Sequence, residues 1–307
     1  MIESHAFTLP HGITLHARVT GEANRPVLLF LHGFPESAFV WDPLLEYFAR
    51  PEQGGYRCVA PCMRGYPPSS VPIELSAYHA KHLVEDVTTL VDQITRSCPT
   101  PGRVAALIAH DWGGAIAWNV AALHPDKLAQ LVILNAPHAG TFLRDLQHSP
   151  AQQAASAYMR FLTRTDAGPL LAEDDYRRLW GFFETATGSA PWLTDAVRAQ
   201  YRAVWQMGLE GPLNYYRASP LRPPSPEETT PRTLTLPGEL LQVSRPTLVI
   251  WGMKDHALLP GLLDGLDAYV QPLQVEHLDD ASHWLVHERP LEIARRIAGF
   301  LNTPNKA

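Results

Sequence analysis

Cysteine is scarce in this chain. The three cysteines, Cys58, Cys62 and Cys98, form no CxxC pair, and their odd number suits a reducing compartment better than a disulfide framework. None of them has histidine or cysteine neighbours at the spacings that metal ligands show. The sequence therefore argues against a disulfide-stapled fold, and we expect no metal site.

Basic charge is also in short supply. The chain has 25 Lys and Arg residues against 31 Asp and Glu residues, which gives a formal net charge of −6. Proteins that bind nucleic acids usually carry a basic field on one face. We therefore expect no nucleic-acid partner.

Long apolar runs are absent as well. No run approaches the roughly 18 residues that a helix needs to span a bilayer. The N-terminal segment MIESHAFTLPHG lacks the basic start and the apolar stretch of a signal peptide. These features predict a soluble, cytoplasmic protein with no membrane partner.

Short runs rich in Val, Ile and Leu are abundant, and helical patterns separate them. The runs are continuous rather than alternating, which is typical of buried parallel strands. The clearest runs are Val27–Leu31, Arg57–Ala60, Val104–Ala109, Leu131–Leu134, Thr247–Trp251 and Gln274–Leu278. Helices are predicted over His82–Ile94, Trp112–His124 and Leu291–Leu301. This alternation predicts an α/β fold with a mostly parallel, doubly wound sheet and helices on both faces.

The alternation breaks between residues 139 and 237. Helical patterns continue there, but no strand pattern returns before a Pro-dense tail from Pro220 to Pro237, which indicates an extended return connection. The helical patterns cover Gln152–Leu162, Asp174–Thr185 and Thr194–Arg217. The sequence therefore predicts an α/β core formed by residues 1–138 and 238–307, with residues 139–237 inserted as a helical cap.

The segment VAALIAHDWGGAIAW carries the strongest functional signal. A buried strand ends at Ala109 and a helix begins within a few residues, so the chain turns sharply and lifts one side chain above the sheet. This is the geometry of a nucleophile elbow, G-x-S-x-G, with Asp111 in the serine position. Gly113 permits close backbone approach, and a helix N-terminus favours an ionised carboxylate, which needs no activating base. The simpler alternative is that Asp111 only caps the helix.

A second loop is expected to reach the same place. His32, Gly33, Phe34 and Pro35 follow the first buried strand directly. The Phe34 N–H is predicted to form an oxyanion hole together with the N–H of Trp112. His32 and Pro35 are expected beside the substrate.

A carboxylate and a histidine then follow in the order that such sites use, nucleophile, acid and histidine. Asp255 lies four residues after a buried strand, and His283 follows the next strand. We predict that Asp255 orients His283 and that Trp284 contacts the substrate. His287 is a rival for the base, although a solvated helical face is expected for it. The rivals for the acid are Asp264, Asp267, Asp279 and Asp280.

These residues resemble the α/β-hydrolase superfamily and, within it, the epoxide hydrolases that use an aspartate nucleophile. The shared motifs are HGFPES, AHDWGG, LNAPH, NYYR, IWGxxD and ASHW, and the resemblance extends from His32 to the last predicted helix. The chain departs from the family in the loop after the second run, where Cys62 replaces an acid and Pro67-Pro68 stiffen the turn.

The resemblance also implies two cap tyrosines that hold and protonate an epoxide oxygen. The segment Asn-Tyr-Tyr-Arg matches the family pattern N-x-Y-R, so the second of these roles carries over to Tyr216. The segment SAYMRFLTRT offers Tyr158 for the first role, as a looser match. Tyr176, Tyr201 and Tyr215 are the other candidates in the cap.

The function that this resemblance implies is hydrolysis of an epoxide in two steps. Asp111 attacks the ring to form a glycol ester, and His283 then activates water against that ester. No cofactor is expected. A cap rich in Trp and Phe favours an apolar or aromatic small-molecule substrate.

Two alternatives remain open at this point. A haloalkane or haloacid dehalogenase would use the same aspartate nucleophile. Haloalkane dehalogenases, however, usually carry Asn at the position of Phe34, and fluoroacetate dehalogenases resemble one another in arginines at the positions of Trp112 and Ala115. A non-catalytic small-molecule receptor would be expected to have lost part of the set, whereas Asp111 and its two partners are all present.

Overall fold

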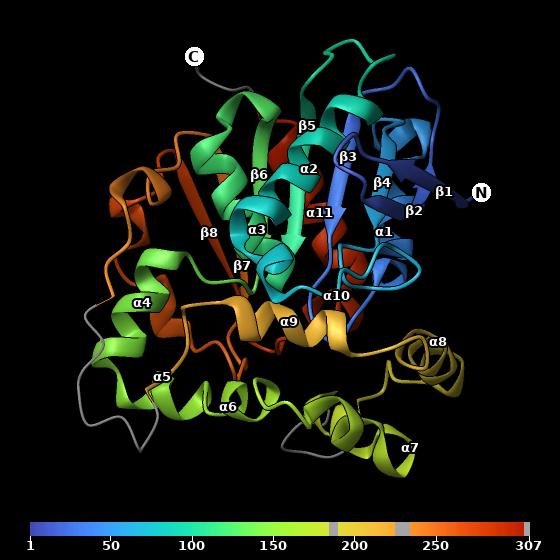
Figure 1. Ribbon diagram of the computed structural model, residues 1–307. Helices are drawn as coiled ribbons and strands as arrows, with labels where there is room; N and C mark the ends of the chain where they lie inside the picture. Colours follow the sequence, from blue (N-terminus) through green and yellow to red (C-terminus); the bar gives the residue numbers. More distant parts are fainter. Residues whose placement is uncertain (184–189, 225–233, 304–307) are drawn as a thin grey trace.

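A single twisted sheet of eight strands organises the computed structural model (Figure 1), which describes residues 1–183, 190–224 and 234–303. The strand order is β1-β2-β4-β3-β5-β6-β7-β8. Strands β3 to β8 run parallel to one another, and β1 and β2 are antiparallel additions at one edge. The strands are β1 (Glu3–Thr8), β2 (Thr14–Thr20), β3 (Val27–Leu31), β4 (Arg57–Pro61), β5 (Val104–His110), β6 (Leu128–Leu134), β7 (Thr247–Gly252) and β8 (Leu273–Leu278).

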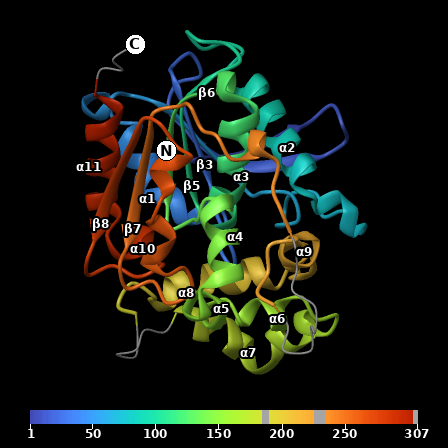
Figure 2. The same ribbon diagram turned by 90° about the vertical axis from the view of Figure 1, so that its left-hand side faces the viewer.

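Helices cover both faces of this sheet (Figure 2). On one face lie α2 (Ala80–Ile94) and α3 (Asp111–Leu123), and on the other lie α1 (Asp42–Phe48) and α11 (Pro290–Leu301). Each helix turns an apolar stripe towards the sheet, as in α2, where Leu83, Val87 and Leu90 are buried at helical spacing. The short helix α10 (Leu285–Glu288) precedes α11. The predicted α/β fold with a doubly wound sheet is therefore confirmed.

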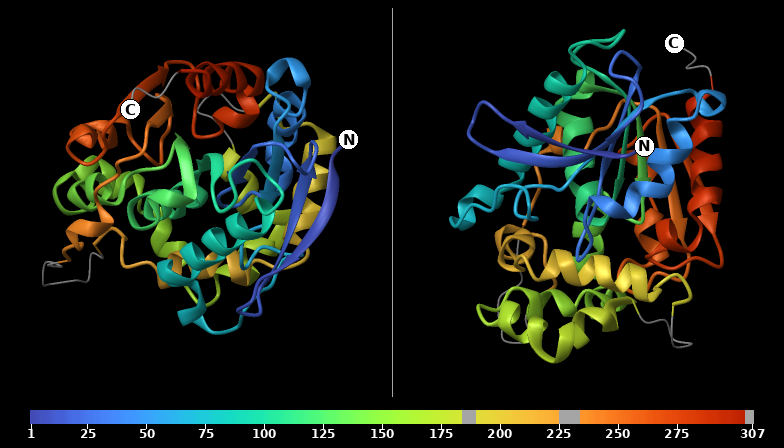
Figure 3. Two further views of the ribbon diagram at one scale, coloured as in Figure 1. Left: turned by 90° about the horizontal axis from the view of Figure 1, so that it is seen from above. Right: turned by 90° about the vertical axis from the view of Figure 1, so that its right-hand side faces the viewer.

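A second group of helices lies beyond the carboxyl ends of the parallel strands (Figures 1 and 3). These helices, which are called the cap below only as a name for the group, are α4 (Ala139–His148), α5 (Pro150–Ala155), α6 (Tyr158–Leu162), α7 (Ala167–Phe183), α8 (Asp195–Trp205) and α9 (Glu210–Ala218). The three-part division at residues 138 and 237 stays a prediction. Part of the expected return connection lies outside the described residues, as does the end of the helix predicted up to Thr185. Ligands of open α/β sheets bind at the carboxyl ends of the strands, so these helices cover the expected site.

The strand predictions succeed where apolar runs are continuous and fail where they are not. All six predicted strands form, but β1 and β2 were not predicted because inward and outward residues alternate in them. The last strand, β8, was expected to be buried, yet it is an edge strand with exposed residues because only β7 pairs with it. None of the helices in the described ranges combines the length and apolar character needed to cross a membrane.

The predicted cap helices are broken more often than their hydrophobic pattern indicates. The segment Gln152–Leu162 contains two helices, α5 and α6, and Thr194–Arg217 contains α8 and α9. Gly208, which has a positive φ of 129°, lies in the second break. Helix α4 was not predicted at all.

Candidate active site

The strand-to-helix turn after β5 has the geometry of a nucleophile elbow. Asp111 has a φ of 50°, a left-handed conformation that non-glycine residues adopt at a cost of about 1–3 kcal/mol. Glycines let neighbouring backbone come close: a Cβ on Gly113 would collide with the carbonyl oxygens of Leu31 and His32, and one on Gly33 would collide with the Asp111 side chain. The strained turn thus holds one carboxylate against the loop after β3.

The Asp111 carboxylate lies between a backbone donor and an imidazole. The N–H of Phe34 donates to Asp111 Oδ1 at 2.8 Å, and His283 Nε2 lies 3.6 Å from Oδ2. The side chain of Asp111 is only 11% exposed. Within the described residues no hydrogen bond joins the Trp112 N–H to this carboxylate, and its oxyanion-hole role stays a prediction.

His283 is oriented from its other nitrogen. Its Nδ1 donates to Asp255 Oδ2 at 2.7 Å, as predicted from the order of the residues. The fully buried Asp255 carboxylate also accepts hydrogen bonds from the backbone N–H groups of Ala257 and Leu258 and from the Asn135 side chain. These bonds fix the plane of the carboxylate and, through it, the plane of the imidazole.

Charge favours the protonated form of this imidazole. Burial by itself would lower the pKa of His283, but the carboxylates of Asp255 and Asp111 outweigh it and raise the pKa to about 9. The same contact holds the pKa of Asp255 below its ordinary value, although burial alone would raise it. An aspartate, an imidazolium and a second aspartate therefore form a charged row across the carboxyl ends of β5 and β7.

Two tyrosines from the cap complete the site around Asp111. Tyr158 on α6 and Tyr216 on α9 have rings 6.2 Å apart in an edge-to-face arrangement, and both line the cavities above the Asp111 carboxylate. Burial raises the pKa of each hydroxyl, and the nearby Asp111 carboxylate raises it further. Both hydroxyls therefore keep their protons and are able to donate hydrogen bonds.

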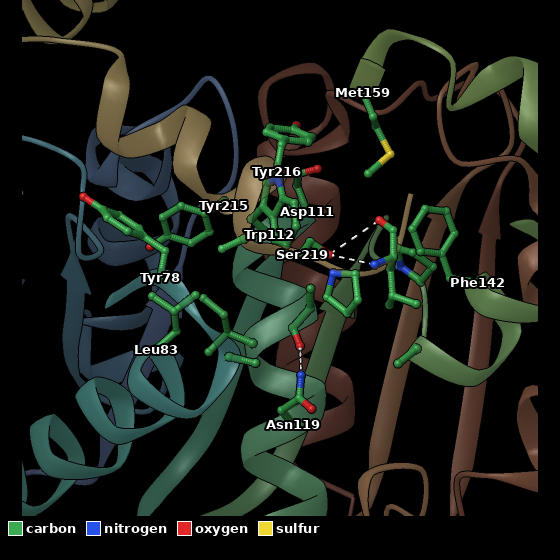
Figure 4. Close-up of a pocket in the computed structure, with 18 of the residues that line it drawn as sticks. Tyr78, Leu83, Asp111, Trp112, Asn119, Phe142, Met159, Tyr215, Tyr216 and Ser219 are labelled. Carbon is green, nitrogen blue, oxygen red and sulfur yellow. Dashed lines mark hydrogen bonds between the residues drawn. The ribbon is translucent and has the colours of Figure 1, made fainter. Parts of the chain in front are cut away.

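Two compartments meet at Asp111, Tyr158 and Tyr216, which line both of them. The first, the apolar compartment, extends between α3, α4 and the cap; Figure 4 shows Trp112 and Met159 among its walls. The second, the polar compartment, extends past His283 towards charged side chains at the surface. Other walls of the apolar compartment are formed by Leu83, Ile116, Phe142, Leu221 and Leu258.

Of the three residues predicted to contact a substrate, one lines a compartment and two do not. Trp284 lines the polar compartment and donates its indole N–H to the Phe182 carbonyl. His32 is fully buried, donates from Nδ1 to the Gly33 carbonyl and accepts from the Met63 N–H, so it holds the loop and lines neither compartment. Pro35 is also buried, and its carbonyl accepts a hydrogen bond from the indole N–H of Trp205. The structure thus does not place His32 or Pro35 against a substrate.

Sequence reasoning missed a buried carboxylate behind the site. Glu36 is 1% exposed and accepts hydrogen bonds from His110 Nδ1 (3.0 Å), His287 Nε2 (2.8 Å) and the Tyr201 hydroxyl (3.2 Å). The other nitrogen of His110 donates to the His283 carbonyl at 2.9 Å. Carboxylates and carbonyls only accept, so both nitrogens of His110 donate. The network ties the elbow, the His283 loop and the cap together.

His287 belongs to this network and not to the solvated face that we expected. Its ring stacks on Trp192 at 4.2 Å between centroids, and its side chain is only 11% exposed. Glu36, the fifth residue of the HGFPES motif, was the available sequence signal, because a charged residue in the loop after a buried strand needs partners. No group of three or more metal-ligating side chains occurs in the part of the chain that the structure describes.

A family model described as the alpha/beta hydrolase fold matches residues 26–290. The chain belongs to the α/β-hydrolase family. The matched residues include all of β3 to β8, the elbow at Asp111 and both loops that carry Asp255 and His283.

Several relatives of this α/β-hydrolase are named epoxide hydrolases. A protein named epoxide hydrolase from Caballeronia sordidicola is 31% identical, and the match covers 95% of this chain and 92% of the relative. An AB hydrolase superfamily protein from Bacillus subtilis is also 31% identical, and the match covers 96% of each chain.

Solved structures lead to the same group. A structure described under novel epoxide hydrolases from metagenomes of hot environments superposes with a TM-score of 0.85 at 33% identity, covering 99% of both chains. The epoxide hydrolase of Bacillus megaterium, solved with an inhibitor, gives a TM-score of 0.80 at 27% identity over 97% of this chain and 100% of its own.

Proposed function

We propose that this α/β-hydrolase is an epoxide hydrolase that works through a covalent ester on Asp111. The observation that carries the proposal is the pair of buried, protonated hydroxyls of Tyr158 and Tyr216 above a carboxylate at the elbow. An epoxide opens to a poorly leaving alkoxide, so a positioned proton donor is what this substrate needs from the site. The epoxide hydrolases among its relatives support the same activity.

In the first step Asp111 Oδ2 attacks an epoxide carbon while Oδ1 stays bound to the Phe34 N–H. The carbon–oxygen bond of the ring breaks, and the ring oxygen takes a proton from Tyr158 or Tyr216. The product is a glycol ester whose carbonyl oxygen, Oδ1, already lies in the oxyanion hole. No base takes part, because the aspartate is ionised beforehand.

In the second step His283 removes a proton from a water that attacks the ester carbonyl carbon. Esterification removes the negative charge of Asp111, which together with the carboxylates of Asp255 and Glu36 holds the pKa of His283 at about 9. The pKa of the imidazole therefore falls when the ester forms, and the proton that His283 gives up restores the hydroxyl of the tyrosine that protonated the ring oxygen. The neutral imidazole is then the base that the second step requires. The Phe34 N–H stabilises the tetrahedral oxyanion, and collapse releases a vicinal diol and the free carboxylate.

The substrate expected from the walls is an epoxide with an apolar or aromatic group. A dehalogenase would release halide, which needs hydrogen-bond donors and no proton, so the two phenolic hydroxyls favour an epoxide over a haloalkane. A receptor without activity would not need the Asp255–His283 pair beside Asp111.

The decisive experiment is intact-protein mass spectrometry of His283→Gln after mixing with a terminal aryl epoxide. Attack does not need the imidazole and hydrolysis does, so the variant should gain one epoxide mass on the peptide that contains Asp111. The burst should match the enzyme concentration and then stop. His277→Gln, on the exposed face of β8, is the matched control and should turn over without accumulating an adduct.

Two outcomes would contradict this mechanism. An unmodified His283→Gln protein that still folds and binds the epoxide would show that His283 acts before ring opening. Single turnover of the parent enzyme, without substitutions, in ¹⁸O-water should leave the label on the Asp111 carboxylate, because water attacks the ester carbonyl. Label in the diol would indicate direct attack of water on the ring.

A further inference from the structure

The polar compartment differs from the apolar one in charge, and this difference selects substrates if the proposed function holds. Its charged lining residues are Asp111, Asp255, Asp280, Glu288, Lys254 and His283. With the imidazole protonated, two cations oppose four carboxylates, which leaves an excess of two negative charges. A compartment that bears such an excess attracts cations and repels anions.

The two cations of this compartment are already paired. Lys254 Nζ lies 3.1 Å from Asp280 Oδ1, and His283 is bound to Asp255 at 2.7 Å. Lys254 is also 60% exposed, so solvent screens its charge. The unbalanced negative charge therefore belongs to Asp111 and Glu288.

Glu288 is held in place by the loop that carries the base. Its Oε1 accepts from the Ser282 hydroxyl at 2.6 Å and its Oε2 from the Ser282 N–H at 2.8 Å. Neither donor carries a charge, so the carboxylate keeps its full negative charge at a fixed point of the compartment wall.

Aromatic rings line another part of this compartment. Phe34 and Phe182 meet edge to face with centroids 6.0 Å apart, and Trp284 donates to the Phe182 carbonyl beside them. The faces of such rings attract cations, most strongly when the cation has lost part of its water. Aromatic rings and a fixed carboxylate in the lining of one compartment are the chemistry that recognises an ammonium group.

We propose that the substrate is an unsymmetrical epoxide with an apolar group on one carbon and an ammonium-bearing substituent on the other, and that the ammonium group lies in the polar compartment. The apolar group lies on the far side of Asp111, between α3, α4 and the cap. The epoxide ring lies at the junction, below Tyr158 and Tyr216. A substituent that carries a carboxylate meets Glu288 and is rejected.

Three matched epoxides test this selection. All carry a phenethyl group on one carbon; on the other they carry trimethylammoniomethyl, its neutral isostere 2,2-dimethylpropyl, or carboxymethyl. The ammonium compound should exceed the neutral isostere in kcat/KM by about tenfold, and the carboxylate should fall about tenfold below it. Both gaps should narrow in high salt, since screening weakens charge interactions at a partly open site.

Glu288→Gln identifies the responsible group. The amide can still accept from the Ser282 N–H, so the loop keeps its support while one negative charge is lost. We expect the ratio of kcat/KM between the ammonium compound and its neutral isostere to shrink several-fold. The control is Glu292→Gln, which removes a carboxylate that is bound to Arg296 outside the compartment.

Equal kcat/KM for the ammonium compound and its neutral isostere would overturn the inference, as would a Glu288→Gln variant that slows all three compounds alike. A carboxylate compound that depends on Lys254, and loses its activity in Lys254→Met, would overturn it too. The affinities of the three product diols, measured by calorimetry, give the same ranking without turnover. If no epoxide reacts but the diols still rank by charge, the proposed reaction fails and the charge selection stands.

Discussion

At the scale of single residues, the proposed mechanism uses the Tyr216 hydroxyl only in the first chemical step. In that mechanism the hydroxyl donates to the ring oxygen of the epoxide, and this oxygen is already an alcohol when the ester is hydrolysed. Tyr216→Phe should therefore slow ester formation by about 10²–10⁴-fold, or by less where Tyr158 supplies the proton, and leave ester hydrolysis unchanged. Rapid-quench measurement of the covalent adduct separates the two rates.

Tyr215→Phe is the matched control on the same helix. Its hydroxyl donates to the Arg64 carbonyl at 2.6 Å, away from Asp111, so its loss should cost stability and not chemistry. A Tyr216→Phe variant that forms the ester at the normal rate but hydrolyses it slowly would show that the hydroxyl acts in the second step and not in the first.

A second prediction at this scale concerns the pH dependence of ester hydrolysis. The pKa of His283 is about 9 while Asp111 and Asp255 flank it. In the proposed mechanism this pKa falls once Asp111 is esterified. The rate of ester hydrolysis should therefore rise with pH and become constant above an apparent pKa that lies below about 9, because only the neutral imidazole accepts a proton. Asp255→Asn should lower this apparent pKa further and slow the plateau rate. Decay that does not change between about pH 5 and 9 would exclude an imidazole base.

At the scale of whole elements, local chemistry decides what the sequence can predict. The runs that became β3 to β7 are mostly apolar because both faces of a parallel sheet are covered, and such runs are recognisable in one sequence. The breaks within the cap depend on how its helices pack on the core, which no local pattern reports. Helix α7 illustrates this, since four of its residues, from Glu173 to Tyr176, depart from helical φ and ψ angles.

Helix α9 depends on one close contact with the core. A Cβ on Gly211 would collide with the backbone of Gly65, so only glycine lets α9 lie against this loop. Gly211→Ala should push α9 outwards, move Tyr216 away from Asp111 and destabilise the protein by about 1–3 kcal/mol. We expect ester formation to slow and the melting temperature to fall together.

Gly299→Ala is the control for this prediction. Gly299 lies on the exposed side of α11, where an added Cβ meets nothing within 4 Å. Alanine there should stabilise the protein by about 0.5–1 kcal/mol and leave the rates unchanged. A Gly211→Ala protein that is as stable and as active as the parent would show that the loop yields without moving the helix.

At the scale of the whole molecule, contacts between distant segments are what the sequence conceals. The order of Asp111, Asp255 and His283 was predictable, because each follows a strand of the parallel sheet and the carboxyl ends of these strands meet. The partners of Glu36 were not, since they lie 74, 165 and 251 residues away on three different elements. No spacing rule connects the loop that carries Glu36 with β5, α8 and α10.

The Glu36 network should control how stability depends on pH. Burial alone would raise the pKa of Glu36, but hydrogen bonds from His110 and His287 outweigh it and hold the pKa below the ordinary 4.5. A carboxyl whose folded pKa is depressed contributes stability above its unfolded value and loses that contribution as pH falls towards the folded pKa. The opposite holds for His283, whose contribution is complete below 6.5 and is lost as pH rises through about 9. Stability should therefore be greatest between these limits.

Glu36→Gln tests the acid limb of this dependence. Replacing a buried carboxylate and leaving His110 and His287 with weaker partners should cost about 3 kcal/mol at neutral pH. Below about pH 4.5 the parent progressively loses the contribution of Glu36, so the difference between the two proteins should narrow, while both decline alike above about pH 7 through His283. Urea unfolding at a series of pH values measures these differences directly. A gap that stays constant down to about pH 3 would mean that Glu36 stabilises the fold by packing and not by its charge.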